Sequence, residues 1–138
     1  GSAQALSRRT RRMKVAYVDT SCLVAISFGE GRASALTRRL KTFDELVSAN
    51  LLEAELRAAF ARERVPPDSD IPFPISWILP DRPLTAEIAR TLDAGYVRGA
   101  DCWHLATALY LAQEPSAMSF VTVDKRQQAV ARTLGFEL

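Results

Sequence analysis

The fold is decided by the stretch Lys14-Val-Ala-Tyr-Val18 and by the polar residues Asp19-Thr-Ser21 that follow it directly. The first five residues form a short apolar run with two β-branched valines, which predicts a strand. Apolar side chains then continue at helical spacing from Leu23 to Phe28, which predicts a helix that begins at the polar residues. A strand that leads straight into a helix is typical of α/β proteins with parallel sheets.

The rest of the chain continues this alternation. Further strands are predicted at residues 45–48, 75–79 and 120–123, with a short last one at 136–138. Helices are predicted at residues 32–43, 50–64, 84–92, 99–112 and 124–134. With 138 residues, of which 48% are hydrophobic, the chain can bury one sizeable core. We therefore predict a single domain over residues 14–138, an α/β three-layer sandwich with a mainly parallel central sheet flanked by helices.

Residues 1–13 are set apart by their charge and are excluded from this domain. Gly1-Ser2 has the form of a remnant of cloning, and Met13 is a possible internal start. Five of the 18 basic residues of the chain lie between Arg8 and Lys14, which leaves 13 basic against all 16 acidic side chains in the remainder. We expect a solvated, disordered arm with at most weak contact to a phosphate backbone. The domain itself lacks the basic face of a charge-driven nucleic-acid binder.

Hydropathy and cysteine usage exclude two further classes of protein. No apolar run approaches the roughly 20 residues that span a bilayer, and the start lacks the apolar centre of a signal peptide. We therefore expect a soluble, cytoplasmic protein without a membrane partner. Cys22 and Cys102 are far apart and outside any C-x-x-C pattern, so we interpret both as reduced core cysteines. Together with His104, the only histidine, they make an incomplete zinc set.

Three aspartates occupy positions where a ligand site is expected. Asp19 and Asp124 each follow a predicted strand and precede a helix, which places them at the carboxyl edge of a parallel sheet, where ligands bind. Asp101 stands at the head of its helix on the same face as Leu105 and Ala108, so its carboxylate should point inward. Each aspartate alone is explained more simply as a helix N-cap. Three converging acids would instead repel one another and favour a hard divalent cation, Mg²⁺ or Mn²⁺.

The motifs, taken in order, resemble the signatures of PIN-domain proteins, and most closely those of VapC-type toxins from bacterial toxin–antitoxin pairs. They are Val18-Asp-Thr-Ser21, Glu55-Leu-Arg-Ala58, Gly99-Ala-Asp-Cys-Trp-His-Leu-Ala-Thr-Ala-Leu109 and Val121-Thr-Val-Asp124. The resemblance covers residues 14–138. It implies parallel strands flanked by helices, a magnesium-dependent endoribonuclease acting on RNA, a frequent homodimer, and inhibition by an antitoxin whose tail occupies the acidic site.

The resemblance also implies roles for single residues. By position, Asp19, Asp101 and Asp124 match the family's metal-binding aspartates and Glu55 its helical glutamate, so these four acids are the expected catalytic and metal-binding residues. Thr20 and Thr122 are the neighbouring hydroxyls expected to orient a carboxylate or a water. Cys102 departs from the alanine that the family often has beside its aspartate. The implied chemistry is hydrolysis of a phosphodiester assisted by one or two ions, with a water held by Glu55 or Asp124.

The two glutamates of the helix predicted at residues 50–64 are distinguished by their spacing along the helix. Glu53 and Glu55 lie two positions apart and cannot share a helix face. Glu55 stands on the side of Leu52 and Ala59, toward the core, so we predict that it is the catalytic one. His104 is interpreted as a packing or hydrogen-bonding residue rather than a general acid. Trp77 and Trp103 are interpreted as core or dimer-face residues, with stacking on RNA bases as the alternative.

Two other functions remain open from the sequence. A different phosphoryl-transfer enzyme of Rossmann-like fold also places an aspartate after its first strand. Such an enzyme would need a second acid near Asp19 and a separate late lysine, whereas Asp19-Thr-Ser-Cys22 has no second acid and Lys125 directly follows Asp124. The other alternative is a catalytically silent PIN-like binding module. The presence of all four acids counts against it.

Overall fold

The computed structural model describes residues 13–66 and 69–138, so the predictions for the basic arm concern residues outside the described part, apart from Met13 and Lys14. The elements in chain order are β1 (Val15–Val18), α2 (Thr20–Ser27), α3 (Ala33–Leu40), β2 (Glu45–Ala49), α4 (Leu51–Arg62), β3 (Ser76–Ile78), α5 (Thr85–Ala94), α6 (Gly99–Leu111), the 3-10 turn η1 (Pro115–Ala117), β4 (Ser119–Val121) and α7 (Lys125–Leu134). The predicted alternation of strands and helices is therefore present.

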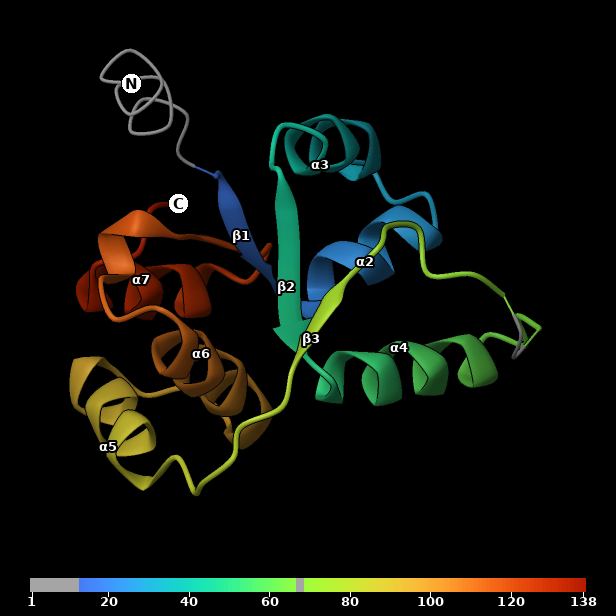
Figure 1. Ribbon diagram of the computed structural model, residues 1–138. Helices are drawn as coiled ribbons and strands as arrows, with labels where there is room; N and C mark the ends of the chain where they lie inside the picture. The colour runs from blue at the N-terminus through green and yellow to red at the C-terminus, as the bar shows by residue number, and fades with distance from the viewer. Residues whose placement is uncertain (1–12, 67–68) are drawn as a thin grey trace, which may run out of the picture.

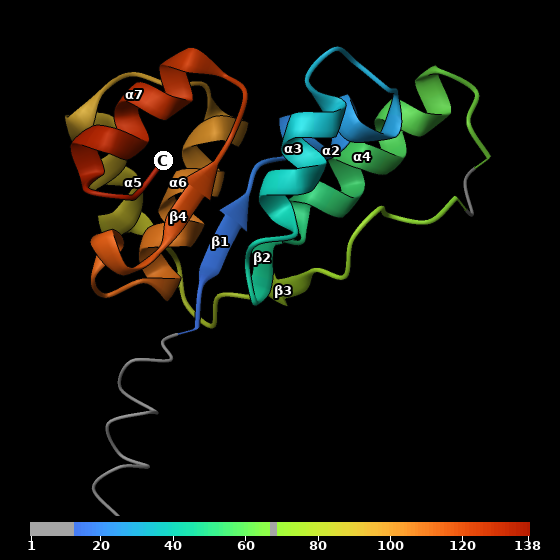
Figure 2. The same ribbon diagram turned by 90° about the horizontal axis from the view of Figure 1, so that it is seen from above.

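The four strands form one sheet in the order β3-β2-β1-β4, and every pairing in it is parallel. Helices α2, α3 and α4 cover one face and α5, α6 and α7 cover the other, as Figure 1 and, more clearly, Figure 2 show. The predicted three-layer α/β sandwich is confirmed. In the described residues, no helix is both long and apolar enough to cross a membrane.

Strand β1 lies inside the sheet and supplies side chains to both hydrophobic layers. Tyr17 packs into the cluster formed with α6 and α7, whereas Ala16 and Val18 pack into the cluster formed with α2, α3 and α4. This follows from the two-residue repeat of a strand, which turns successive side chains to opposite faces. Burial on both faces explains why β1 is apolar throughout, as parallel strands usually are.

Three predicted strands are shorter in the structure, the first of them by Lys14 alone, and one is absent as a strand. β3 covers only residues 76–78 of the predicted 75–79, because Pro74 and Pro80 flank the segment and a proline has no N–H for the ladder. β4 ends at Val121 instead of residue 123. At residues 136–138 only Glu137 pairs, through an isolated bridge to Ser119. Gly135 ends α7 in the left-handed conformation at φ 105°, and three residues are too few to build a further strand.

Candidate active site at the carboxyl edge of the sheet

Asp19 is fixed at the junction of β1 and α2. Its backbone N–H donates to the carbonyl of Val121 in β4 at 2.9 Å, which extends the β1–β4 pairing by one residue. Its Oδ2 accepts the N–H of Ser21 at 3.0 Å, so Asp19 is the N-cap of α2. The residue is only 4% exposed. A buried carboxylate is therefore held at the carboxyl end of an inner strand, where α/β proteins bind ligands.

Asp124 reaches the same edge from β4, but by a turn. Thr122 and Val123 separate it from the strand, and the hydroxyl of Thr122 accepts the N–H of Asp124 at 3.1 Å. Oδ1 of Asp124 accepts the N–H of Gln127 at 2.7 Å and caps α7. The N-cap interpretation is thus correct for Asp19 and Asp124. A cap uses one carboxylate oxygen for the backbone, which leaves the other for a second role.

Asp101 is not a helix cap, so the N-cap interpretation is wrong for this residue. Helix α6 begins at Gly99, its N-cap position is Arg98, and Asp101 lies in the first turn, as the third residue of the helix, with a half-buried side chain. Burial raises the pKa of the Asp101 carboxyl, and the negative charges of Asp19 and Asp124 raise it further. The three aspartates from separate elements therefore lie close enough to affect one another.

Glu55 approaches from α4 and is held by two donors on one oxygen. Thr20 donates its hydroxyl to Oε1 at 2.7 Å, and Nε2 of His104 lies 2.7 Å from the same atom. Burial opposes ionisation of Glu55, but the hydrogen bonds from His104 and Thr20 outweigh it and hold its pKa below the usual value. Glu53 is exposed whereas Glu55 is half-buried, in agreement with the orientation expected from spacing.

The two threonines expected to orient carboxylates or waters have different partners. Thr20 donates to Glu55, as described above. Thr122 donates to Oε1 of Gln127 at 2.7 Å, and its 3.5 Å separation from Oδ2 of Asp19 is too long for more than a weak bond. Thr122 therefore contacts Asp19 mainly through Gln127.

Gln127 is a residue of the site that the sequence reasoning missed. Its side chain is fully buried, and its Nε2 donates to Oδ1 of Asp19 at 3.1 Å and to the carbonyl of Asp101 at 3.4 Å. Its backbone N–H holds Asp124. One residue thus contacts three of the four acids. A signal was present, because a glutamine three positions after a capping aspartate is the pattern of a capping box, although here the side chain turns to Asp19.

The oxygen donors of the site suit a hard cation by their chemistry, although they do not form a complete set of ligands around one. Among the residues that the structure describes, no three His, Cys, Asp or Glu side chains form a set that could hold an ion. The donor set is nevertheless all oxygen, and its charges oppose one another at Asp101. Mg²⁺ keeps several waters and is usually bound through only one or two carboxylates together with substrate phosphates. The side chains therefore fit Mg²⁺ or Mn²⁺ by their chemistry.

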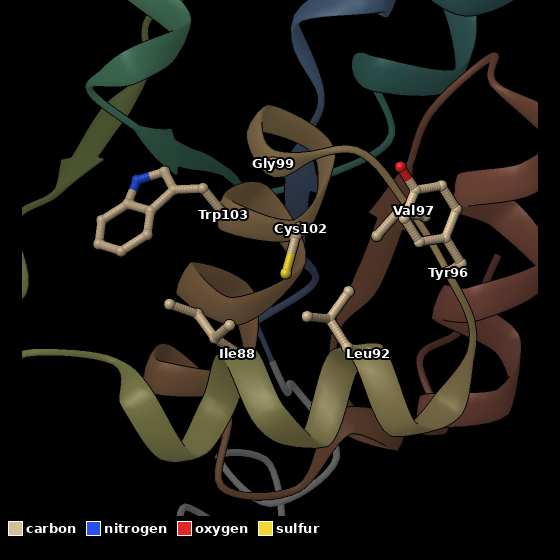
Figure 3. A pocket seen from close by; sticks show the side chains of 7 residues that line it. All are labelled: Ile88, Leu92, Tyr96, Val97, Gly99, Cys102 and Trp103. Atoms are coloured by element: carbon tan, nitrogen blue, oxygen red, sulfur yellow. The ribbon is translucent and has the colours of Figure 1, made fainter.

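An apolar pocket lies between α5 and α6 (Figure 3), and no acidic residue lines it. It is lined by Ile88, Leu92, Tyr96, Val97, Gly99, Cys102 and Trp103. Trp103 and Trp77 are both half-buried and pack against the hydrophobic clusters, which agrees with their interpretation as packing residues. Cys22 and Cys102 are buried and free, as expected.

Comparison with known proteins identifies the family. No curated protein matches the chain, and no solved structure does. A family model described as PIN domain matches residues 16–133, which is most of the chain. The match begins in β1 and ends in α7, so it includes all four acids. The chain therefore belongs to the PIN-domain family, whose members are generally nucleases.

Proposed function

We propose that this protein is a divalent-metal-dependent endoribonuclease that cleaves RNA phosphodiester bonds at the four acids Asp19, Glu55, Asp101 and Asp124. The observation that supports the proposal most is the PIN-domain match, which includes all four acids, and the raised pKa of Asp101, caused by burial and by the charges of Asp19 and Asp124, agrees with it. Clustered carboxylates destabilise a fold unless a cation offsets their repulsion. Magnesium or manganese is the ion that an all-oxygen donor set favours.

Within this proposal the acids have different tasks. Asp19, Asp101 and Asp124 would hold the ion together with Glu55, and the ion when bound would polarise a phosphoryl oxygen and lower the pKa of a water. Glu55 is kept ionised by His104 and Thr20, so it can accept a proton from an attacking water. Asp124 is exposed at the rim and is the alternative group to hold that water.

Cleavage of single-stranded RNA tests the proposal. Purified protein should cut it with Mg²⁺ or Mn²⁺, and EDTA should stop the reaction. Asp19→Asn keeps an oxygen for the α2 cap while removing the charge, so it should fold but lose activity by about 100-fold or more. Equal cutting with and without chelator would contradict the metal dependence. RNA binding without cleavage by the unaltered protein would instead identify a silent binding module.

The two glutamates of α4 provide a matched pair of variants. Glu55→Gln removes the proton acceptor and should reduce cleavage by about 100-fold or more. Glu53→Gln removes the same charge from an exposed position two residues away and should cut RNA like the parent. Single-turnover rates at saturating Mn²⁺ compare the two variants. The assignment would be wrong if Glu53→Gln lost cleavage and Glu55→Gln kept it.

We further propose that the protein is the toxin of a toxin–antitoxin pair. The support is the order of its motifs, which resembles that of VapC-type toxins, and the partner would be an antitoxin whose tail enters the acidic site. Induced expression of the chain in a bacterial host should arrest growth, and Asp19→Asn should not. Arrest by both forms would separate toxicity from nuclease activity and contradict this role.

A homodimer is part of the same proposal. The apolar pocket between α5 and α6 is bordered by two exposed apolar side chains, Leu92 at 45% and Tyr96 at 68% exposure. Exposed apolar groups gathered around a hollow are typical of an interface. Sedimentation velocity should give the mass of two chains, and Tyr96→Arg should shift it to one. A monomeric parent at micromolar concentration would contradict the dimer.

A further inference from the structure

The strongest unexplained feature of the molecule is a line of buried polar groups that runs from β2 through β1 to Glu55. The backbone N–H of Ala49 donates to the phenol oxygen of Tyr17 at 3.0 Å. That oxygen lies 2.6 Å from Nδ1 of His104, and Nε2 of His104 lies 2.7 Å from Oε1 of Glu55. Tyr17 is 0% and His104 1% exposed. Buried polar groups cost stability unless they are paired, so this arrangement calls for a physical reason.

The partners of the Tyr17 oxygen favour one direction for each bond in the line. The Tyr17 oxygen already accepts the N–H of Ala49 at 3.0 Å, so its own hydroxyl proton remains for a second partner. Nδ1 of His104 is placed to accept that proton at 2.6 Å, a length typical of a strong O–H donor bond. Nδ1 then carries a lone pair, and the ring proton of a neutral imidazole must be on Nε2. Nε2 therefore donates to Glu55.

The line also connects the two helical layers. His104 belongs to α6, and Glu55 belongs to α4, and these helices cover opposite faces of the sheet (Figure 2). Each helix packs mainly into its own hydrophobic cluster. The bond from Nε2 to Oε1 thus ties Glu55 to the opposite layer. Hydrogen-bond partners that lie behind a metal-binding carboxylate commonly fix its orientation.

Both donors to Glu55 use the same oxygen, and this decides which atom remains available. Thr20 and His104 both bond to Oε1, while no described side chain or backbone group bonds to Oε2. A carboxylate oxygen without a protein partner at the edge of an acidic site is free for an ion or a water. The geometry therefore gives the two oxygens of one side chain separate tasks.

We propose that Tyr17 and His104 form a positioning relay that fixes the carboxylate of Glu55 through Oε1 and presents Oε2 to the metal site. His104 is a positioning residue and does not touch the substrate. The relay deepens the proposed function and rests on it for the role of Oε2 at an ion. The bond between His104 and Glu55 itself does not depend on the proposed function.

The single histidine of the chain makes the relay directly observable. In protein labelled with ¹⁵N-histidine and treated with EDTA, the spectrum of the neutral imidazole should show the proton on Nε2 and none on Nδ1. Tyr17→Phe should move the Nδ1 resonance toward that of an unbonded imidazole nitrogen, because this atom loses its donor. Glu55→Gln should move the Nε2 resonance. A proton on Nδ1 in the parent, or an Nε2 resonance that ignores Glu55→Gln, would overturn the relay.

Binding of Mn²⁺, measured by calorimetry, tests the consequence for the site. His104→Leu should weaken binding by about tenfold, as removal of an outer-layer partner of a metal ligand usually does. His104→Gln carries an amide N–H near the place of Nε2 and should recover most of that loss. Thr107→Val is the control, because it removes a buried hydroxyl from the same helix, and this hydroxyl donates to the carbonyl of Trp103. The variant should bind Mn²⁺ like the parent.

The outcomes separate the relay from the proposed function. If the parent binds Mn²⁺ and folded His104→Leu binds it equally tightly, the relay fails while the proposed function stands. If the parent binds no Mn²⁺ but its imidazole spectrum responds to Glu55→Gln as described, the proposed function fails while the bond from His104 to Glu55 stands. Thermal melts establish folding first. If His104→Leu does not fold, the recovery by His104→Gln and the Tyr17→Phe resonance shift decide the question.

Discussion

At the scale of single residues, Asp101 shows how the acid site opposes stability. Its carboxyl is half-buried, belongs to no helix cap, and has a raised pKa because of burial and of the charges of Asp19 and Asp124. A group whose pKa is higher in the folded than in the unfolded protein destabilises the fold once it is ionised. The ionised carboxylate of Asp101 therefore lowers the stability of the metal-free protein at neutral pH.

We expect Asp101→Asn to melt higher than the parent in EDTA at pH 7. As the pH falls through the raised pKa of folded Asp101, the carboxylate becomes protonated and no longer destabilises the parent. The two proteins should therefore melt alike below the ordinary aspartate pKa of about 3.9. Asp93→Asn, at an exposed position of α5, controls for removal of one negative charge. Melts from pH 3 to pH 7 measure the difference. A lower melting temperature for Asp101→Asn at pH 7 would contradict repulsion among the acids.

Gln127 is the residue that fixes Asp19. Gln127→Leu keeps the approximate size of the side chain but removes the donor to Oδ1 of Asp19 and the acceptor of Thr122. Leaving these buried groups unpaired should lower the free energy of unfolding by about 1–3 kcal/mol. Cleavage should slow as well, because Asp19 loses its orientation. Urea denaturation and single-turnover rates measure the two effects.

Gln128→Leu is the matched control for this prediction. It removes a neighbouring amide whose Nε2 bonds to the carbonyl of Thr122 and to no acid. Its effect on the cleavage rate should be much smaller than that of Gln127→Leu. Equal rates for the two variants would show that Gln127 contributes to stability alone.

At the scale of elements, the packing of α5 against α7 depends on a missing side chain. A Cβ added at Gly95, the residue after α5, would lie 2.9 Å from Cγ2 of Val130 in α7. That separation is well inside van der Waals contact. Valine is stiff at χ1 in a helix and cannot turn aside easily. The close approach of these two helices therefore requires glycine at position 95.

We expect Gly95→Ala to lower the free energy of unfolding by about 1–3 kcal/mol, the usual cost of overpacking. In a Val130→Ala background the same change should cost much less, because the clashing methyl is gone. A double-mutant cycle by urea denaturation measures this coupling. Gly99→Ala is the control, since its added Cβ would meet nothing within 4 Å. A cost of Gly95→Ala that is equal in both backgrounds would locate the strain elsewhere.

At the scale of the whole molecule, the proposed ion site would link ion binding to folding. Asp19 and Asp124 come from two strand ends, and Asp101 and Glu55 come from helices on opposite faces of the sheet. The site exists only when all these elements are packed. An ion that binds this arrangement therefore stabilises the folded protein by mass action.

Millimolar Mn²⁺ should raise the melting temperature of the parent, and it should raise that of Asp101→Asn by less, because the variant has lost a proposed ligand. At 100 times the dissociation constant the stabilisation amounts to about 2.7 kcal/mol. NaCl at the same ionic strength controls for screening of the repulsion among the acids. If NaCl raised both melting temperatures as much as Mn²⁺ does, general screening would account for the effect, and a specific ion site would be contradicted.

Local patterns in the sequence determined most of the architecture. The apolar run before Asp19, the helical spacing behind it and the repetition of this unit predicted a parallel α/β sandwich, because strand and helix periodicity depend on near neighbours in the chain. The same patterns placed Asp19 and Asp124 at the carboxyl edge and turned Glu55 rather than Glu53 toward the interior. The errors were at boundaries: β4 ends two residues early, and residues 136–138 make a single bridge.

Only the tertiary structure decided which side chains hold the acids in place. Gln127 and Asp19 are separated by 108 residues and Glu55 and His104 by 49, so no local pattern relates them. No sequence pattern joins Tyr17 to His104, because a tyrosine in an apolar strand is explained by packing alone. Their bonds form where β1, α4, α6 and α7 come together. This arrangement depends on how the two helical layers pack against the sheet. Hydrogen-bond partners are chosen by distance in space, which the order of residues does not contain.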